Sequence, residues 1–290
     1  MQLDIVIVTY RSARHLPACL APLPFEARVV VVENASGDDA PDLAAATGAD
    51  VIRNDVNAGF GAAANQGAAT GDADLILFLN PDAVILPSDL ELLVKALDAD
   101  PGLAAVGPRL VSPEGAEQQP WWPFPSPART WAEAFGLHRL RPKGPGGDQE
   151  GFVVGACLLV RRVAFDALGG FDPRFWLYGE EADLCRRLWD AGWRVRLVSE
   201  AAATHIGGAS GDSIAGVTFE HFQRGTEHFI AKHHGRVALV SHRIGLLTGS
   251  ALRLPALAAR RDGRARYRWA VVRRLIRRLG THPTTVVTPV

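Results

Sequence analysis

Two polar residues, Asn80 and Asp82, stand directly after an unbroken apolar run, Leu75 to Leu79. Such a run is typical of a parallel strand buried on both faces, and Pro81 cannot continue it. We therefore expect Asp82 at the carboxyl end of a strand, the edge at which open α/β sheets bind ligands. Its carboxylate suits a hard divalent cation. The alternative is that Asn-Pro-Asp is an ordinary turn before the next helix, Ser88 to Asp98.

Three carboxylates, Glu180, Glu181 and Asp183, fall in the first turn of a predicted helix, which two leucines at helical spacing indicate. Acids in a first turn complement the helix dipole, and Asp183 can pair with Arg187 at i, i+4. This structural role accounts for one or two of them. Because crowding like charges is costly unless a cation or substrate hydroxyls use them, we expect at least one to face a polar site.

A histidine, His205, follows the predicted strand Arg194 to Val198 and precedes a glycine-rich turn. Imidazole is a common metal ligand, so this position after a strand and before a glycine-rich turn is compatible with a role as a ligand. A lone histidine is equally compatible with a purely structural role.

The elements that position these residues alternate between strand and helix, which indicates an α/β fold with a mostly parallel, doubly wound sheet flanked by helices. The expected strands are Leu3 to Val8, Arg28 to Val32, Val51 to Arg53, Leu75 to Leu79, Ala104 to Val106, Phe152 to Val160 and Arg194 to Val198. The expected helices are Ala13 to Leu20, Asp39 to Thr47, Gly61 to Gly71, Leu90 to Leu97, Arg161 to Leu168 and the segment from Glu180 to Leu188.

The segment from Gly59 to Ala64 matches the dinucleotide fingerprint G-x-G-x-x-A. That fingerprint needs a strand running directly into its first glycine. Here Asn54, Asp55 and Asn57 intervene, and three strands come before. We therefore favour close helix-to-sheet packing over a Rossmann dehydrogenase.

Residues 112–150 are rich in proline, glycine and aromatic residues, including Trp121 and Trp122. A connection this long inside a compact domain is usually a functional loop or a disordered one. Its aromatic rings suit stacking on sugar or lipid, or membership of a satellite core.

The composition is that of a folded protein, since 48% of the 290 residues are hydrophobic and 21% are charged. The N-terminal apolar stretch is short and follows Asp4, so we expect a first strand there, no secretory signal, and a cytoplasmic protein. Cys19, Cys157 and Cys185 are widely separated, which predicts core thiols in place of disulfides or a zinc site.

The net charge of zero conceals a basic C-terminal segment. Ten arginines and one acid lie between Arg253 and Arg278, leaving 21 basic and 30 acidic residues elsewhere. We expect residues 236–290 to be a basic amphipathic helical extension that contacts an anionic membrane surface through 260–279. The alternative is a basic helix packed on the acidic domain. The apolar face of this helix would hold Trp269, Val272, Leu275, Ile276 and Leu279.

Several segments, taken in order, resemble the motifs of family 2 glycosyltransferases. The resemblance covers about Leu3 to Ser210. It is closest to the rhamnosyltransferase-like branch, whose members add a deoxysugar to a polyprenyl-diphosphate-linked acceptor. The matching segments are Ile5 to Tyr10, Val31 to Ser36, Asn57 to Phe60, Asn80 to Asp82, Gly169 to Asp172, Tyr178 to Leu184 and His205.

The resemblance implies a GT-A catalytic domain over residues 1–235 and inverting transfer from a nucleotide-diphosphate sugar to a hydroxyl of a glycan or lipid-linked saccharide. It implies a divalent metal, Mg²⁺ or Mn²⁺, at Asp82 and His205, and Glu181 as the general base. The residues implied to bind the nucleotide sugar are Thr9, Tyr10, Glu33, Asn34, Asn57, Gly59, Asn65 and Asn80, and those implied to orient the acceptor are Glu180, Asp183 and Trp176.

Three departures from the family's pattern concern acids. Glu33 and Glu181 each stand where the family usually has the shorter aspartate, and Asn80 replaces the first aspartate of its Asp-x-Asp motif. The change at Glu33 bears on which nucleobase the donor carries, and the change at Glu181 bears on which residue is the general base. Asn80 would still contact the nucleotide or a metal-bound water. The implied setting is polysaccharide or cell-wall synthesis at the inner face of the cell membrane.

Three other classes of function are considered. A sugar-phosphate nucleotidyltransferase would share the α/β core but needs a glycine-rich basic loop near the first strand, where Thr9 to Ser12 contains no glycine. A non-catalytic membrane-associated scaffold would show no nucleotide-sugar turnover. A nucleic-acid binder would use the arginines, but these form no known recognition module.

Overall fold

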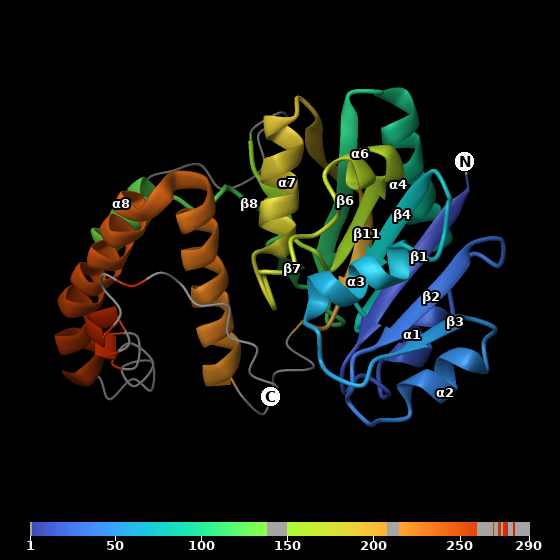
Figure 1. Cartoon of the computed structure of the whole chain (residues 1–290), viewed down its shortest axis with the longest axis horizontal. Coiled ribbons are helices and arrows are strands. Elements are labelled where there is room, and N and C mark those ends of the chain that lie inside the picture. Colours follow the sequence, from blue (N-terminus) through green and yellow to red (C-terminus); the bar gives the residue numbers. More distant parts are fainter. Residues whose placement is uncertain are drawn as a thin grey trace. The chain divides into compact units, whose positions relative to one another are not determined.

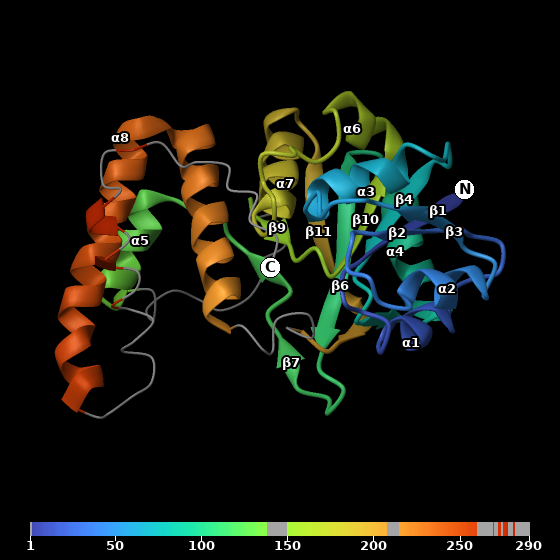
Figure 2. The same ribbon diagram turned by 60° about the horizontal axis from the view of Figure 1, so that its bottom comes forward.

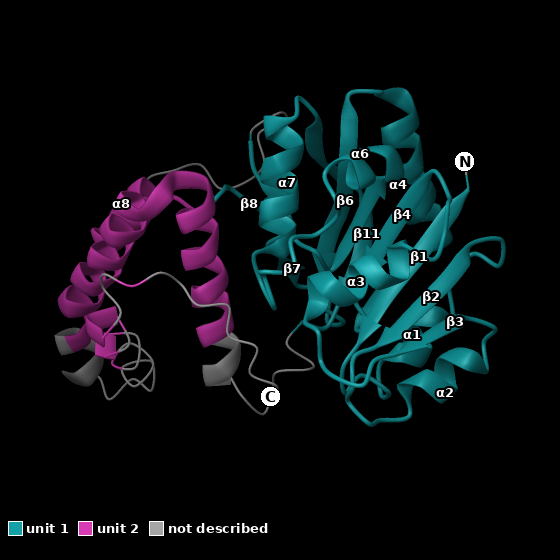
Figure 3. Ribbon diagram, viewed as in Figure 1, with its two compact units in different colours: residues 1–124, 145–214, 286–290 teal, residues 125–144, 215–285 magenta. Residues whose placement is uncertain are grey.

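The structure is a computed structural model that describes residues 2–137, 150–207 and 215–259, together with 269, 272, 273, 275–277 and 281. The chain forms two compact units (Figure 3). Unit 1 comprises residues 1–124, 145–214 and 286–290, and unit 2 comprises residues 125–144 and 215–285. The expected domain boundary after residue 235 falls inside unit 2, and the independence of a domain 1–235 stays a prediction.

Within the described residues, unit 1 holds a mixed sheet of nine strands in the order β3-β2-β1-β4-β10-β6-β11-β5, with β7 paired to β6 (Figures 1 and 2). Neighbours among β1 to β4 are parallel, as are β6 and β11. β10 runs antiparallel between β4 and β6, and β5 is antiparallel to β11. The strands are β1 Leu3–Thr9, β2 Arg28–Glu33, β3 Asp50–Arg53, β4 Leu75–Leu79, β5 Ala83–Ile85, β6 Leu103–Val111, β7 Glu117–Gln118, β10 Cys157–Arg161 and β11 Arg194–His205.

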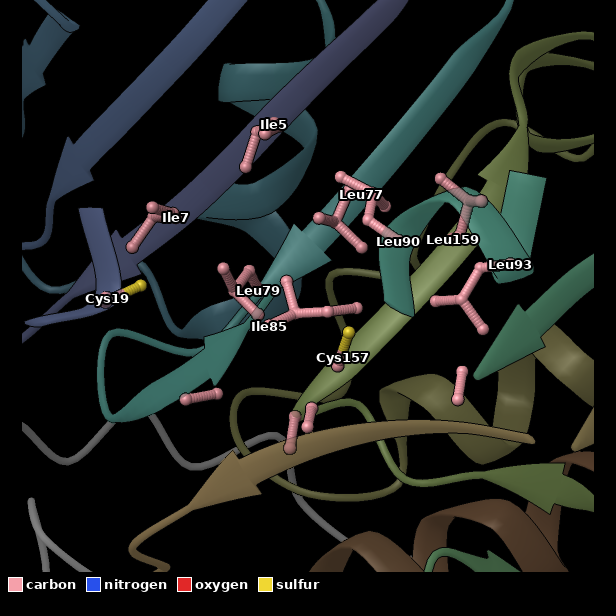
Figure 4. Packing of buried hydrophobic residues seen from close by; sticks show 14 of the residues in the cluster. Ile5, Ile7, Cys19, Leu77, Leu79, Ile85, Leu90, Leu93, Cys157 and Leu159 are labelled. Atoms are coloured by element: carbon pink, nitrogen blue, oxygen red, sulfur yellow. The ribbon is translucent and has the colours of Figure 1, made fainter. Parts of the chain in front are cut away.

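Helices pack on both faces of this sheet, so successive residues of a central strand enter different cores. Ile5 and Ile7 of β1 face a core that includes α1, α2 and α4 (Figure 4), whereas Val6 and Val8 face one with α3, α6 and α7. The three cysteines are free and buried, as predicted. The helices are α1 Leu16–Leu20, α2 Ala40–Ala45, α3 Phe60–Ala68, α4 Pro87–Ala99, α6 Arg162–Ala167 and α7 Glu180–Asp190.

The apolar run from Phe152 to Val160 is two strands, so the prediction of one strand is wrong. β9, Phe152–Val153, pairs with β8, Trp121–Trp122, in a separate small sheet. The chain then crosses Gly155 and enters the main sheet as β10. Both halves are apolar because each packs in a core, and hydrophobicity alone does not show where a chain changes its pairing partner.

Residues 112–150 contain regular structure where we expected only a loop. Besides β7 and β8 they hold helix α5, Pro127–Ala134, whose N-cap Ser126 accepts a hydrogen bond from the Arg129 backbone N–H. Trp121 is buried in a core, whereas Trp122 is about half exposed. Proline at the first helical position explains how a proline-rich segment can start a helix.

Unit 2 is built on α8, Ala215–Ala259, whose two helical segments meet at Gly235 with φ 83°. The expected boundary after residue 235 coincides with this kink. α5 packs on α8 through a hydrogen bond of 2.6 Å between Thr130 Oγ1 and His242 Nδ1. Arg243 and Glu227 form a buried ion pair of 2.6 Å.

The basic segment is described at only a few positions, and most of 260–279 lies outside the described residues. Leu275 is buried, whereas Trp269 and Ile276 are exposed. That these residues share one apolar face stays a prediction. Arg273 and Arg277 are exposed as well. No helix in the described part of the chain has the length and apolar character of a membrane span.

Arg162 ties α6 to the start of β1 through nearly buried contacts. Its Nη2 lies 2.6 Å from Asp4 Oδ2, and its Nε and Nη1 donate to the carbonyl oxygens of Ala73 and Ala68. Arg162→Ala leaves the Asp4 charge buried and unpaired, so we expect the free energy of unfolding to fall by about 3–5 kcal/mol.

Urea denaturation measures this loss. The matched control is Arg53→Ala, which removes an exposed pair with Asp42 and should cost about 0–1 kcal/mol. Equal losses for the two variants would contradict a supporting role for the Arg162 contacts.

Candidate active site

The chain leaves β4 at Asn80 and turns sharply, as the sequence predicts. The Asn80 N–H donates to Ala156 O at 2.9 Å, and the Ala83 N–H donates to Asn80 O at 3.0 Å. These bonds fasten the turn to the chain just before β10 and start β5 directly after Asp82. The tripeptide is thus a turn at the carboxyl edge of the sheet, but it leads into β5 and does not cap the next helix, whose N-cap is Leu86.

Asp82 and His205 lie side by side because β5 pairs with the end of β11. The register places Ala83 opposite His205, and the Ile206 N–H donates to Asp82 O at 3.1 Å. His205 Nε2 is 3.5 Å from Asp82 Oδ1, and both side chains are nearly covered. His205 is the last residue of β11, so the predicted strand end at Val198 is seven residues too early. Two residues far apart in the sequence thus form one pair.

The Asp82 carboxyl is held in its ionised form. Burial raises the pKa of this carboxyl, but the hydrogen bond and positive charge that His205 supplies when its ring is protonated outweigh this effect, and the pKa lies below its ordinary value. A carboxylate oxygen and an imidazole nitrogen at this separation can both reach one divalent cation, since metal–ligand distances are about 2.0–2.2 Å. The described residues contain no group of three or more potential metal-ligating side chains. The pair therefore fits a cation that also takes ligands from a substrate.

Gln118, in β7, contacts His205 of the Asp82–His205 pair. It was not among the site residues predicted from the sequence. Its Oε1 lies 3.0 Å from His205 Nδ1, and its Nε2 donates to His205 O at 2.6 Å. Gln118 is followed by Gln119 and then by Pro120, and neither its type nor its spacing carries a sequence signal. Only the β6–β7 hairpin brings it to His205.

The ends of β1 and β2 carry the residues expected around the nucleotide. Thr9 is buried and its hydroxyl donates to Val32 O at 3.5 Å, whereas Tyr10 is partly exposed. Glu33 Oε1 accepts from both the backbone N–H and the hydroxyl of Ser36, at 2.5 and 2.6 Å. The turn after β2 thus holds the Glu33 carboxylate in one orientation at the same edge of the sheet as Asn80.

Asn34 shapes the loop before α3. Its Oδ1 accepts from the Ala58 N–H at 2.9 Å, and its Nδ2 donates to Asn57 Oδ1 at 2.9 Å. Gly59 has φ 83°, and a Cβ there would lie 2.4 Å from Trp176 O. The structure brings the site residues Asn34, Asn57 and Gly59 together, and Asn34 Oδ1 also accepts a hydrogen bond from Asn54 Nδ2 at 3.1 Å.

The segment before α7 is tied to α3. Asn65 donates to Phe171 O at 2.8 Å and accepts from the Phe171 N–H at 2.9 Å. Trp176 O accepts from the Phe60 N–H at 2.9 Å, and its indole N–H donates to Asn57 O at 3.4 Å. The contacts of Asn65 and Trp176 show how they position the chain that leads to the acidic turn.

The three acids of α7 have different surroundings. Asp183 is fully buried and 2.8 Å from Arg187 Nε, the pair predicted from the sequence. Glu180 is buried, whereas Glu181 is partly exposed. Glu181 packs against Gly155, because a Cβ added to Gly155 would lie 3.6 Å from the Cβ of Glu181. Because Gly155 precedes the residue that binds Asn80, Glu181 stands beside the carboxyl end of β4.

Burial raises the pKa of both glutamates. The Glu181 charge raises the pKa of Glu180 further, to well above its ordinary value. Backbone hydrogen bonds at Glu181, Gly179 and Gly155 offset part of the rise at Glu181. Within the described structure, Oε2 of each glutamate is buried without a hydrogen-bond partner. Burial thus favours the protonated form of both carboxyls, and backbone hydrogen bonds favour the ionised form of Glu181.

Comparison with known proteins identifies the family. The sequence pattern of Glycosyl transferase family 2 matches residues 4–169, and that of the N-terminal domain of galactosyltransferase matches residues 144–207. The N-acetylglucosaminyl-diphospho-decaprenol L-rhamnosyltransferase of Mycobacterium tuberculosis is 32% identical over 234 residues, which are 70% of this chain and 75% of that protein.

Solved structures show the same fold at low sequence identity. A mannosyltransferase from Pyrobaculum calidifontis, in complex with GDP-Man and Mn²⁺, is 17% identical with a TM-score of 0.61, covering 96% of this chain and 81% of that one. GalNAc-T7, with UDP, GalNAc and Mn²⁺, is 16% identical with a TM-score of 0.54, covering 81% and 50%. This chain has the GT-A fold and belongs to glycosyl transferase family 2.

Proposed function

We propose that the protein transfers a sugar, with inversion, from a nucleotide-diphosphate sugar to a hydroxyl of a lipid-linked saccharide. The observation that carries this proposal is that one sheet edge presents both the Asp82–His205 pair and Glu181. The relative from M. tuberculosis supports rhamnose as the sugar and a polyprenyl-diphosphate-linked saccharide as the acceptor, because its name states both kinds of substrate.

Asp82 and His205 are proposed to hold a divalent cation, Mg²⁺ or Mn²⁺. Their atoms fit one cation, and the two solved structures described above contain Mn²⁺. Such a cation, when bound, stabilises the negative charge on the departing diphosphate. Thr9 and Tyr10 are proposed to line the nucleotide site, with Glu33 on base or ribose and Asn80 beside the diphosphate.

Glu181 is proposed as the general base. The acceptor hydroxyl gives its proton to the Glu181 carboxylate while its oxygen bonds to the anomeric carbon, and the bond from that carbon to the diphosphate oxygen breaks. Glu180, whose protonated form is favoured by burial, is proposed to orient the acceptor or the loop by donating a hydrogen bond. Asp183 contributes through Arg187, which also donates to Leu168 O and Gly170 O below the acidic turn.

The exposed part of the basic segment is proposed to rest on an anionic membrane surface. Trp269, Arg273, Ile276 and Arg277 are all exposed, so aromatic, aliphatic and cationic groups face solvent on one short stretch. Each arginine near such a surface contributes about 1 kcal/mol of binding. This contact would keep the enzyme at the inner face of the membrane, beside a lipid-linked acceptor.

Asp82→Asn should lower kcat/KM by about 100- to 1,000-fold, because the amide keeps the shape but removes the charge that holds the cation. The assay is donor hydrolysis and transfer over a panel of nucleotide sugars with Mg²⁺ or Mn²⁺. Asp42→Asn, at an exposed residue of α2, is the matched control. Full activity of Asp82→Asn, or of the wild type in excess chelator, would contradict the cation site.

Glu181→Gln should lower kcat by about 10²- to 10⁴-fold while donor binding persists, since an amide cannot accept the hydroxyl proton. Steady-state kinetics and donor titration separate the two effects. Glu180→Gln is the neighbouring control and should act mainly on the acceptor KM. If the loss of kcat follows Glu180 instead, the base is assigned to the wrong glutamate.

Glu180→Gln should also stabilise the fold, increasingly so as the pH rises. A carboxyl whose pKa is raised by folding binds its proton more tightly in the folded state, so it destabilises the fold above its ordinary value of 4.5. Urea unfolding at a series of pH values should show an advantage of the variant that grows above that value. An advantage independent of pH would mean that the Glu180 pKa is not raised.

A further inference from the structure

The contacts of Gln118 determine how its own amide is oriented. Its Nε2 faces His205 O at 2.6 Å, and a backbone carbonyl can only accept a hydrogen bond. The amide NH₂ group must therefore be the end that faces this carbonyl. This fixes the other end, Oε1, against His205 Nδ1 at 3.0 Å.

The orientation of the amide in turn determines the proton on the imidazole. An amide oxygen only accepts, so His205 Nδ1 must carry the hydrogen that bridges to Gln118 Oε1. In a neutral imidazole the second nitrogen is then unprotonated. That nitrogen, Nε2, is the one that lies 3.5 Å from Asp82 Oδ1.

We infer that Gln118 is a positioning residue that fixes His205 as the Nδ1–H tautomer and thereby directs the Nε2 lone pair at the cation site. A positive charge between this lone pair and the Asp82 carboxylate stabilises the arrangement, and a bound divalent cation supplies one. Hydrogen bonds of this kind to the distal nitrogen of a ligating histidine fix the ring and raise its basicity. The inference rests on the proposed cation at Asp82 and His205.

The surroundings anchor the strand that carries Gln118 and leave space beside the Gln118–His205 pair at Gly207. β7 is anchored to β6 by the pairing of Gln118 with Leu110, and Glu117 forms an ion pair of 2.5 Å with Arg109. On the other side, a Cβ on Gly207 would lie 3.6 Å from His205 Cε1 and 3.8 Å from Gln118 Nε2. Gly207 has φ 72°, a conformation that favours glycine, and this lets the chain turn directly after β11, close to the side chains of His205 and Gln118.

The test compares Gln118→Leu and Gln118→Glu with the wild type. Long-range ¹H–¹⁵N correlation spectra report the tautomer of His205, recorded without metal at a pH where the ring is neutral and assigned by difference from His205→Gln. Binding of Mn²⁺ alone is followed by the electron paramagnetic resonance of the free ion. Gln119→Leu is the matched control, because the side chain of Gln119 donates to Trp121 O and is not among the contacts of His205.

We expect the Nδ1–H tautomer in the wild type and a shift toward Nε2–H in Gln118→Leu, with Mn²⁺ affinity lowered about 10- to 100-fold. Gln118→Glu keeps an acceptor for Nδ1 and should retain the wild-type tautomer, and Gln119→Leu should match the wild type in both measurements.

An Nε2–H tautomer in the wild type, or an unchanged tautomer in Gln118→Leu, would overturn the inference. An unchanged Mn²⁺ affinity in a variant whose tautomer has shifted would overturn the link to the cation. If the wild type binds no Mn²⁺, the proposed cation site fails, and the tautomer comparison still decides the role of Gln118.

Discussion

The candidate site depends on the antiparallel pairing of β5 with β11. Asp82 precedes β5 and His205 ends β11, so the register of a three-residue strand decides whether the two side chains meet. A slip of one residue would turn His205 to the opposite face of the sheet. The bond from the Ile206 N–H to Asp82 O closes the ladder at this point, and Gln118 then fixes the ring. Backbone pairing therefore determines whether the Asp82 carboxylate and the His205 imidazole lie close enough to act together.

The acidic turn of α7 is held by a second set of backbone contacts. Asn65 binds both polar groups of the Phe171 backbone, and Arg187 binds carbonyl oxygens on the preceding turn. Tyr178 and Gly179 both have positive φ immediately before the helix. A tyrosine in this conformation is strained, and such strain persists only where the surroundings enforce it. The fixed approach keeps Glu181 over Gly155, on the same edge of the sheet as Asp82, although two carboxyls become buried there.

The sequence is sufficient to predict the elements that end at the site, but not the contacts between distant segments. The apolar run of β4 and the polar residues after it correctly place Asp82 at the sheet edge, and helical spacing correctly predicts α7 and the Asp183–Arg187 pair. Gln118 could not be predicted, because its role arises from a hairpin in a proline-rich segment. The same limit explains the split of Phe152 to Val160 into two strands, since an apolar residue does not reveal which strand it pairs with.

The central claim is that Asp82 and His205 bind one divalent cation that also contacts the nucleotide diphosphate. Anomalous diffraction at the manganese edge, from crystals grown with Mn²⁺ and a nucleoside diphosphate, tests it most directly. The account predicts an anomalous peak within bonding distance of an Asp82 carboxylate oxygen, of His205 Nε2 and of the diphosphate oxygens. A peak bound to the diphosphate but away from His205, or one at a different edge of the sheet, would contradict it.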